Sequence, residues 1–204
     1  MIKWYRFVAL ASIPFLVTAC QANKPSDEPT NQVLGASTTM DTAAQPTRHF
    51  DAAPDKLPDD QLTNKQVVLH TTKGDIRFTL FPEDAPLTVS NFVFLTSKHF
   101  YDGLTFHRVE PDFVIQGGDP QGNGTGGPGY KFNDEPVKRS YSRGIVAMAN
   151  SGPNTNGSQF FIMLKDTPLP PAYTIFGEVT DGMDVVDQIR VGDTMTTVEI
   201  QDKQ

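Results

Sequence analysis

The chain has 204 residues, of which 38% are hydrophobic, and it carries a formal net charge of -7. Its Lys and Arg residues form no cluster beyond short pairs, so we expect no nucleic-acid binding. Cys20 is the only cysteine, which excludes a disulfide within the chain.

The N-terminus has the pattern of an export signal. Lys3 and Arg6 precede an apolar run over residues 7–17, which small residues and Cys20 follow. The run is shorter than the about 20 apolar residues that a membrane-spanning helix needs. Because LVTAC resembles the lipobox of bacterial lipoproteins, we expect residues 1–19 to be a lipoprotein signal peptide and Cys20 to carry the lipid. A chance cysteine in an ordinary cleaved signal is the alternative.

A lipid on Cys20 would hold the protein to a membrane of the bacterial cell envelope. The next residue, Gln21, is not the aspartate that some Gram-negative bacteria read as inner-membrane retention. This favours the outer membrane.

We expect residues 20–64 to form the lipidated N-terminus and a tether, because the stretch is rich in Pro, Thr, Ala, Gln, Asn and Asp. No helical or strand period is present as far as Leu62, and the composition predicts a disordered tether. His49 and Phe50 interrupt the polar run, but nothing around them indicates a site. The remaining residues 65–204 have the usual size of one domain with a single core.

A hairpin is predicted over residues 65–81, with its turn at residues 73–75. Pro86 suits the first turn of the helix that follows. The apolar side of that helix is formed at helical spacing by Val89, Phe92, Val93 and Thr96. Its opposite side is predicted to be polar and carries Ser90, Ser97 and Lys98.

Short segments separated by Gly and Pro turns predict a series of further strands. They contain FHR at 106–108, FVIQGG at 113–118, and residues 145–149, 159–164, 173–179 and 196–200. Between the last two, residues 184–190 have the apolar spacing of a second helix.

Two polar side chains stand out in the apolar strand pair around FHR and FVIQGG. Residues two apart point to the same side of a strand, so Arg108 and Gln116 are expected to share one face. A solvated charge at the rim is the alternative for an isolated arginine. His107 is expected to point away from Arg108 and to have a structural role.

Other motifs in this region do not indicate a cofactor. The four histidines lack the paired spacing of zinc ligands, so we expect no metal. Gly122, Gly124 and Gly127 satisfy G-x-G-x-x-G, but Pro128 follows where a dinucleotide-binding fingerprint opens a helix.

FHR, QGGD and the stretch AMANSGPNTNGSQFFIM over residues 147–163 together resemble the cyclophilin family of peptidyl-prolyl cis-trans isomerases. The resemblance covers roughly residues 65–204. It implies a mainly β fold, a closed eight-stranded antiparallel barrel capped by two α-helices. It also implies an enzyme that works on X-Pro bonds without metal or cofactor.

The resemblance assigns catalysis to Arg108, which meets the proline nitrogen, and to Gln116, which positions arginine and substrate. Its proline pocket falls on Phe113, Val114, Phe161 and Leu169. Its adjoining groove for residues before the proline falls on Gly124, Ala149 and Gln159, and the backbone of Asn150 holds the substrate main chain. Many cyclophilins carry a Trp and a His in the loop after Met163, whereas this chain has Tyr173 in the place of the His.

Rotation about an X-Pro bond needs no nucleophile, because the obstacle is the partial double-bond character of the amide. We therefore expect a monomeric isomerase that acts on proline-containing polypeptides and assists the folding of exported or envelope proteins. The alternative is a non-catalytic cyclophilin-like module that binds peptides or acts as a chaperone with the same groove.

Overall fold

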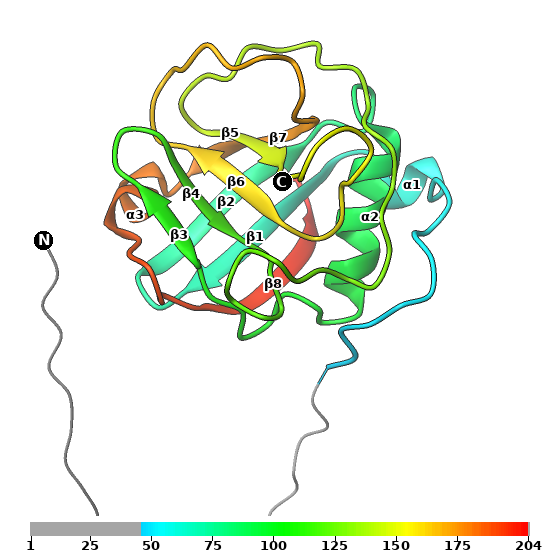
Figure 1. Cartoon of the computed structure of the whole chain (residues 1–204), viewed down its shortest axis with the longest axis horizontal. Coiled ribbons are helices and arrows are strands. Elements are labelled where there is room, and N and C mark those ends of the chain that lie inside the picture. The colour runs from blue at the N-terminus through cyan, green and yellow to red at the C-terminus, as the bar shows by residue number, and fades with distance from the viewer. Residues whose placement is uncertain (1–45, 204) are drawn as a thin grey trace, which may run out of the picture. The chain divides into compact units, whose positions relative to one another are not determined.

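The computed structural model describes residues 46–203, so the predicted signal peptide, Cys20 and the first part of the predicted tether lie outside the described residues. Eight strands form one antiparallel sheet in the order β3-β4-β6-β5-β7-β2-β1-β8 (Figure 1). Their bounds are β1 Lys65–Thr71, β2 Gly74–Leu80, β3 Arg108–Glu110, β4 Val114–Gly117, β5 Ile145–Met148, β6 Phe160–Met163, β7 Ile175–Asp181 and β8 Met195–Asp202. The mainly β fold is confirmed, and each predicted strand overlaps an observed one, although β3 begins only at Arg108, the last residue of FHR.

The sheet is curled but open, and the closed barrel that we expected is not formed. The end strands β3 and β8 do not pair along their length. Only the isolated bridge between Thr105 and Thr194 and nearby backbone hydrogen bonds join the segments beside them. Strand β3 is short because Pro111, which follows it, cannot donate the next hydrogen bond of a ladder.

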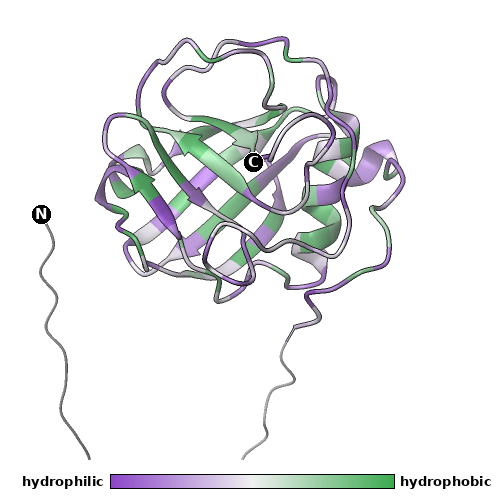
Figure 2. Cartoon of the chain, viewed as in Figure 1, coloured by the Kyte–Doolittle hydropathy of each residue, from purple (hydrophilic) through white to green (hydrophobic). Residues whose placement is uncertain are grey.

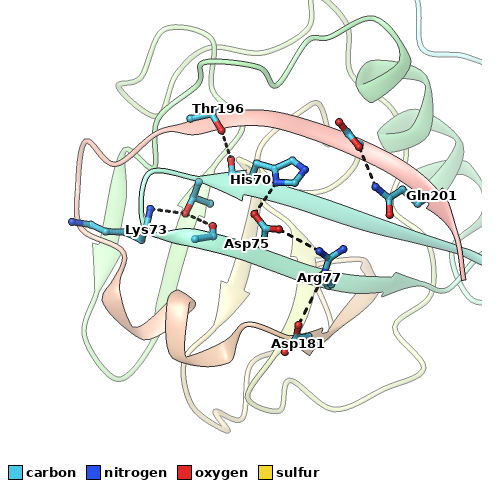
Figure 3. Close-up of polar contacts among 10 residues, drawn as sticks. His70, Lys73, Asp75, Arg77, Asp181, Thr196 and Gln201 are labelled. Atoms are coloured by element: carbon cyan, nitrogen blue, oxygen red, sulfur yellow. Dashed lines mark hydrogen bonds and ion pairs between the residues drawn. The ribbon is translucent and has the colours of Figure 1, made fainter. Parts of the chain in front are cut away.

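The first hairpin shows how alternation places the core. In β2 the side chains of Ile76, Phe78 and Leu80 are buried and alternate with more exposed residues. Figure 2 shows apolar and polar residues alternating along the central strands. On the outer face, the ring Nδ1 of His70 lies 2.7 Å from a carboxylate oxygen of Asp75. Arg77 continues this chain of charges to Asp181 (Figure 3).

The two predicted helices are present, at opposite ends of the curled sheet (Figure 1). They are α2, Pro86–Ser97, and α3, Met183–Gln188. The carboxylate of Glu135 accepts hydrogen bonds from the N–H groups of Leu87 and Thr88 at 2.9 and 2.8 Å, so a distant loop supplies the N-terminal cap of α2.

Helix α2 is buried on more than its apolar side. Val89, Phe92, Val93 and Thr96 are buried as predicted, but Ser90, which we expected to be exposed, is 0% exposed. Its hydroxyl donates to the carbonyl of Pro86 and accepts from the N–H of Leu57. The prediction for Ser90 is wrong because residues before the sheet cover that side of the helix.

These covering residues belong to the segment that we predicted to be a disordered tether. Within residues 46–64 a third, short helix forms, α1, Asp59–Leu62, whose Leu62 is 1% exposed in the core. The ring of Phe50 packs against that of Phe94 at 5.2 Å, and Arg48 donates to the carbonyl of Asp102 at 2.6 Å. This part of the chain is ordered, contrary to the expectation, and we name residues 46–62 the N-terminal strap.

Between residues 46 and 203, none of the helices combines the length and the apolarity that crossing a bilayer requires.

Candidate active site

Arg108 and Gln116 lie opposite one another across the β3–β4 ladder, on one face as the alternation predicted. Arg108 donates from Nη1 to Oε1 of Gln116 at 3.2 Å. Gln116 in turn donates from Nε2 to Oε1 of Gln159 at 2.9 Å. The two amides thereby hold the guanidinium in a fixed relay that runs from β3 toward β6.

The rest of the Arg108 side chain faces solvent and an aromatic ring. Its guanidinium carbon lies 5.7 Å from the ring centroid of Phe113, and Nε lies 3.5 Å from a carboxylate oxygen of Glu110. The side chain is 44% exposed. Since a guanidinium carries five N–H donors and only one is used by Gln116, donors remain for a ligand.

An apolar patch adjoins Arg108. Six of the predicted site residues lie in or against one hydrophobic cluster that is separate from the main core. Val114 and Phe161 are buried members of the cluster, and Phe113, Ala149, Leu169 and Tyr173 pack against it. Val114 and Phe161 are 1% and 5% exposed, so they form its floor. Phe113, Leu169 and Tyr173 are only partly buried and leave apolar area accessible.

Tyr173 lies in the loop after Met163, where this sequence differs from the pattern of many cyclophilins. Its ring meets that of Phe161 edge to face at 5.6 Å. Its backbone is held at both ends by the hydroxyl of Tyr141, which donates to the carbonyl at 2.9 Å and accepts from the N–H at 3.1 Å. Burial raises the pKa of Tyr141, so the hydroxyl keeps the proton that it donates. The loop therefore presents Tyr173 in a defined position.

A polar groove of about 720 Å³ lies on the other side of Gln116. Its lining includes the predicted residues Gln116, Gly124, Ala149, Asn150 and Gln159. Arg108 and the Phe113–Phe161 patch are not part of that lining, so Gln116 stands between the groove and the patch. The structure thus divides the predicted residues into two neighbouring halves.

Main-chain and amide groups dominate the groove. Gln159 donates from Nε2 to the carbonyls of Gly124 and Gly126 at 3.0 and 2.9 Å, which fixes its amide. Asn150 uses its side-chain amide to bind the carbonyl of Ala172 at 2.7 Å. Among the described residues, the backbone N–H and C=O of Asn150 have no partner, so both are available to an extended peptide.

Sequence reasoning named QGGD as a motif but missed the role of its last residue. Asp119 is 1% exposed, and its carboxylate accepts hydrogen bonds from the N–H groups of Gln121 and Gly124 at 2.7 and 2.5 Å. Burial raises the pKa of Asp119, but these backbone donors, with those of Asn123 and Gly126, lower it overall. Asp119 therefore shapes the Gly-rich loop that walls the groove. An Asp directly before such a loop is the signal that could have identified it.

His107 lies behind this loop, with its ring 3.9 Å from the position that a Cβ on Gly124 would take. Burial lowers the pKa of His107 and the nearby Arg108 acts in the same direction, whereas Asp119 and the side chain of Gln159 oppose the shift. The ring is partly buried and packs against the loop of Gly124. Within residues 46–203 no three His, Cys, Asp or Glu side chains gather as metal ligands would.

Among the lining residues that were not predicted as site residues, two are basic. His49, from the N-terminal strap, and Lys131 both line the groove. Neither belongs to a motif that marks a binding site, and His49 lies in the stretch predicted to be disordered. Only the folded structure brings them to the groove.

Comparison with known proteins places this geometry in a family. The family described as "Cyclophilin type peptidyl-prolyl cis-trans isomerase/CLD" matches residues 66–203. A peptidyl-prolyl cis-trans isomerase of Synechococcus elongatus is 49% identical over 138 residues, which cover 66% of this chain and 95% of the relative. Peptidyl-prolyl cis-trans isomerase B of Bacillus subtilis is 48% identical over 129 residues, 62% of this chain and 90% of that protein.

Solved structures agree with the sequence relatives. The crystal structure of a cyclophilin-type peptidyl-prolyl cis-trans isomerase of Cryptosporidium parvum aligns with a TM-score of 0.64 at 35% identity, covering 67% of this chain and 97% of that one. The same enzyme in the presence of the dipeptide Ala-Pro gives a TM-score of 0.63. The fold, the family profile and the identity to these enzymes lead to one conclusion: the chain belongs to the cyclophilin-type peptidyl-prolyl cis-trans isomerases.

Proposed function

We propose that Arg108 is the group that accelerates X-Pro rotation in this protein, and that the protein does so for exported or envelope polypeptides while a lipid on Cys20 holds it to the membrane. The observation that carries the catalytic part is the relay Arg108–Gln116–Gln159, which fixes a cation at the edge of an apolar patch.

The chemistry follows from the amide bond. A planar X-Pro amide resists rotation by about 18 to 20 kcal/mol because its nitrogen lone pair is delocalised. In the twisted state the lone pair returns to the nitrogen, which then accepts a hydrogen bond. A donor that meets the nitrogen only in the twisted state lowers the barrier, by about 1.4 kcal/mol for each tenfold gain in rate.

The two halves of the site suit the two parts of the substrate. The proline ring packs on the apolar patch of Phe113, Val114 and Phe161, and the Ala-Pro dipeptide present with the C. parvum relative is a ligand of this chemistry. The residues before the proline lie along the polar groove and pair with the backbone of Asn150. Arg108, next to Gln116 at the boundary, then faces the bond that rotates.

The envelope location rests on sequence pattern. The n-region, the apolar run and LVTAC precede a single cysteine, and acylation would use that otherwise exposed thiol. We propose the outer membrane because Gln21 follows the cysteine, and we propose that the protein acts as a monomer on proline-containing polypeptides.

Isomerisation of a short X-Pro peptide, followed by proton NMR exchange or by a protease-coupled assay, tests the catalytic part. We expect exchange between cis and trans to be faster in the presence of the protein than the uncatalysed rate, which has a time constant of tens to hundreds of seconds. If the protein binds the peptide without accelerating exchange, the groove serves a non-catalytic binding or chaperone module instead.

A further inference from the structure

The polar groove has a charge character opposite to that of the whole chain. Its lining contains two basic side chains, His49 and Lys131, and neither Asp nor Glu, although the chain as a whole has a formal net charge of -7. The remaining lining is made of Gly, amide, hydroxyl and backbone groups. A ligand side chain in this groove therefore meets positive charge and hydrogen-bond donors.

The N-terminal strap holds His49 in the groove at several points. On its C-terminal side, the N–H of Phe50 donates to the carbonyl of Pro128 at 2.8 Å, and the Phe50 ring packs on Phe94. On its N-terminal side, Arg48 donates to the carbonyl of Asp102 at 2.6 Å. His49 lies between these anchors and its side chain remains exposed, so a ligand can reach it.

The backbone of Pro128 and Gly129 is in close contact with His49 and Phe50 of the strap. A Cβ on Gly129 would lie 2.7 Å from Nδ1 of His49 and 2.6 Å from the carbonyl oxygen of Phe50, closer than real side chains allow. Gly129 also has a φ of 100°, which favours glycine. The imidazole therefore rests directly on the backbone of the groove wall.

His49 lies outside the part of the chain that relatives share. The family match begins at residue 66, and the relatives and solved structures described above cover at most 67% of the chain. The strap therefore lies outside the matched residues, although it reaches the groove.

We infer that the strap completes the groove, and that His49 together with Lys131 selects substrates with an acidic side chain within three residues before the proline. The inference rests on the proposed function, since it assigns the groove to the residues that precede the proline. The carboxylate would pair with the Lys131 ammonium and accept the N–H that an imidazole offers in either protonation state.

Peptides that differ only in charge test this inference. In a series of short X-Pro peptides, Glu or its isostere Gln is placed one, two or three residues before the proline, and kcat/KM is measured with the full-length protein at low ionic strength. We expect a preference for Glu at one of these positions. Exposed ion pairs of this kind change affinity by about 1.5- to fivefold each, so the two basic residues together predict a preference of roughly two- to 25-fold.

Variants assign the preference to the strap. His49→Ala and Lys131→Gln should each reduce the ratio of Glu to Gln by about 1.5- to fivefold and act through KM, because both contact a part of the substrate remote from the rotating bond. His49→Arg should preserve or increase the ratio. His70→Ala, on β1 and outside the groove lining, is the matched control and should leave the ratio unchanged.

Equal kcat/KM for the Glu and Gln peptides at all three positions would overturn the inference, as would an unchanged ratio in His49→Ala. Salt at about 1 M should reduce the preference for Glu over Gln, since exposed charges are screened.

Chemical-shift titration of the protein with the same peptides measures the preference from binding alone, without catalysis. An inactive protein would thus refute the proposed catalysis while the titration still decides whether His49 selects acidic substrates.

Discussion

At the scale of single residues, the function depends on side chains that are held by their neighbours. Arg108 is partly exposed, and an exposed arginine loses conformational entropy when it binds. Its hydrogen bond to Gln116 and its position over Phe113 reduce that loss before a substrate arrives. Gln116 is held in turn by Gln159, whose amide is fixed by two loop carbonyls.

Arg108→Ala tests the donor directly. A hydrogen bond from a charged group contributes about 1.5 to 3 kcal/mol, so we expect kcat/KM for an X-Pro peptide to fall by roughly ten- to hundredfold. The midpoint of urea unfolding should change little, because the side chain packs on the surface. Arg77→Ala, an arginine on β2 that also pairs with a carboxylate, is the control and should retain activity. Wild-type activity in Arg108→Ala would remove this residue from the mechanism.

Asp119 allows a prediction about pH. Its pKa is lowered in the folded protein, so its carboxylate stabilises the fold above the unfolded pKa of about 4, and this stabilisation is lost as pH falls through the lower folded pKa. Asp119→Asn removes the charge that the loop N–H groups bind and should lower the free energy of unfolding at pH 7 by about 1.5 to 3 kcal/mol.

The difference between Asp119→Asn and wild type should shrink as pH falls below about 4, where the carboxyl of the unfolded wild-type chain becomes protonated, and should be lost below the lower pKa of the folded protein. Urea unfolding at pH 7 and at pH 3 measures it. A difference that stays constant between these two pH values would show that the charge of Asp119 does not stabilise the loop.

At the scale of secondary-structure elements, periodicity predicted which face of an element is apolar but not what covers the other face. The hairpin of β1 and β2 and the buried residues of α2 follow from spacing alone. Ser90 does not, because its burial results from Leu57 and α1, which lie more than 25 residues earlier in a polar stretch. Three isolated apolar residues, Phe50, Leu57 and Leu62, are too sparse to show a period, yet each contacts the core or α2.

The same limit applies to the candidate site. Alternation along the strands was sufficient to predict that Arg108 and Gln116 share a face, as the β3–β4 register shows. The aromatic residues Phe113 and Phe161 were assigned only by the resemblance to the family. The contribution of His49 depends on a contact between the strap and a loop about 80 residues later. No local pattern encodes such a contact.

Leu62→Ala distinguishes an ordered strap from a disordered tether. Because Leu62 is 1% exposed, truncation should lower the free energy of unfolding by about 2 to 4 kcal/mol, the usual effect of a cavity in a core. Val191→Ala, at a side chain that is 65% exposed, is the control and should have almost no effect. Equal midpoints of urea unfolding for Leu62→Ala and wild type would mean that the strap does not pack on the domain in solution.

At the scale of the whole molecule, the ordered strap changes the expected distance between domain and lipid. The predicted tether of residues 20–64 is reduced to residues 20–45 if only the part outside the described residues acts as a linker. For a flexible linker of that length the root-mean-square reach is roughly 25 to 30 Å. If Cys20 carries a lipid, the anchor would then hold the domain within roughly that distance of the lipid.

Cys20→Ser tests whether the molecule is anchored at all. If Cys20 carries lipid, labelled palmitate should enter the wild-type protein and not the variant, and the variant should accumulate as an unprocessed or mislocalised precursor.

The isomerase activity of the variant on a short peptide is the control. It should equal that of the wild type, because the whole described site lies in residues 46–203. This separation matters, since loss of both labelling and activity would indicate misfolding and not loss of an anchor. Equal palmitate labelling of the two proteins would make Cys20 a chance cysteine in an ordinary signal, and the proposed membrane attachment would then be wrong while the assignment of Arg108 would stand.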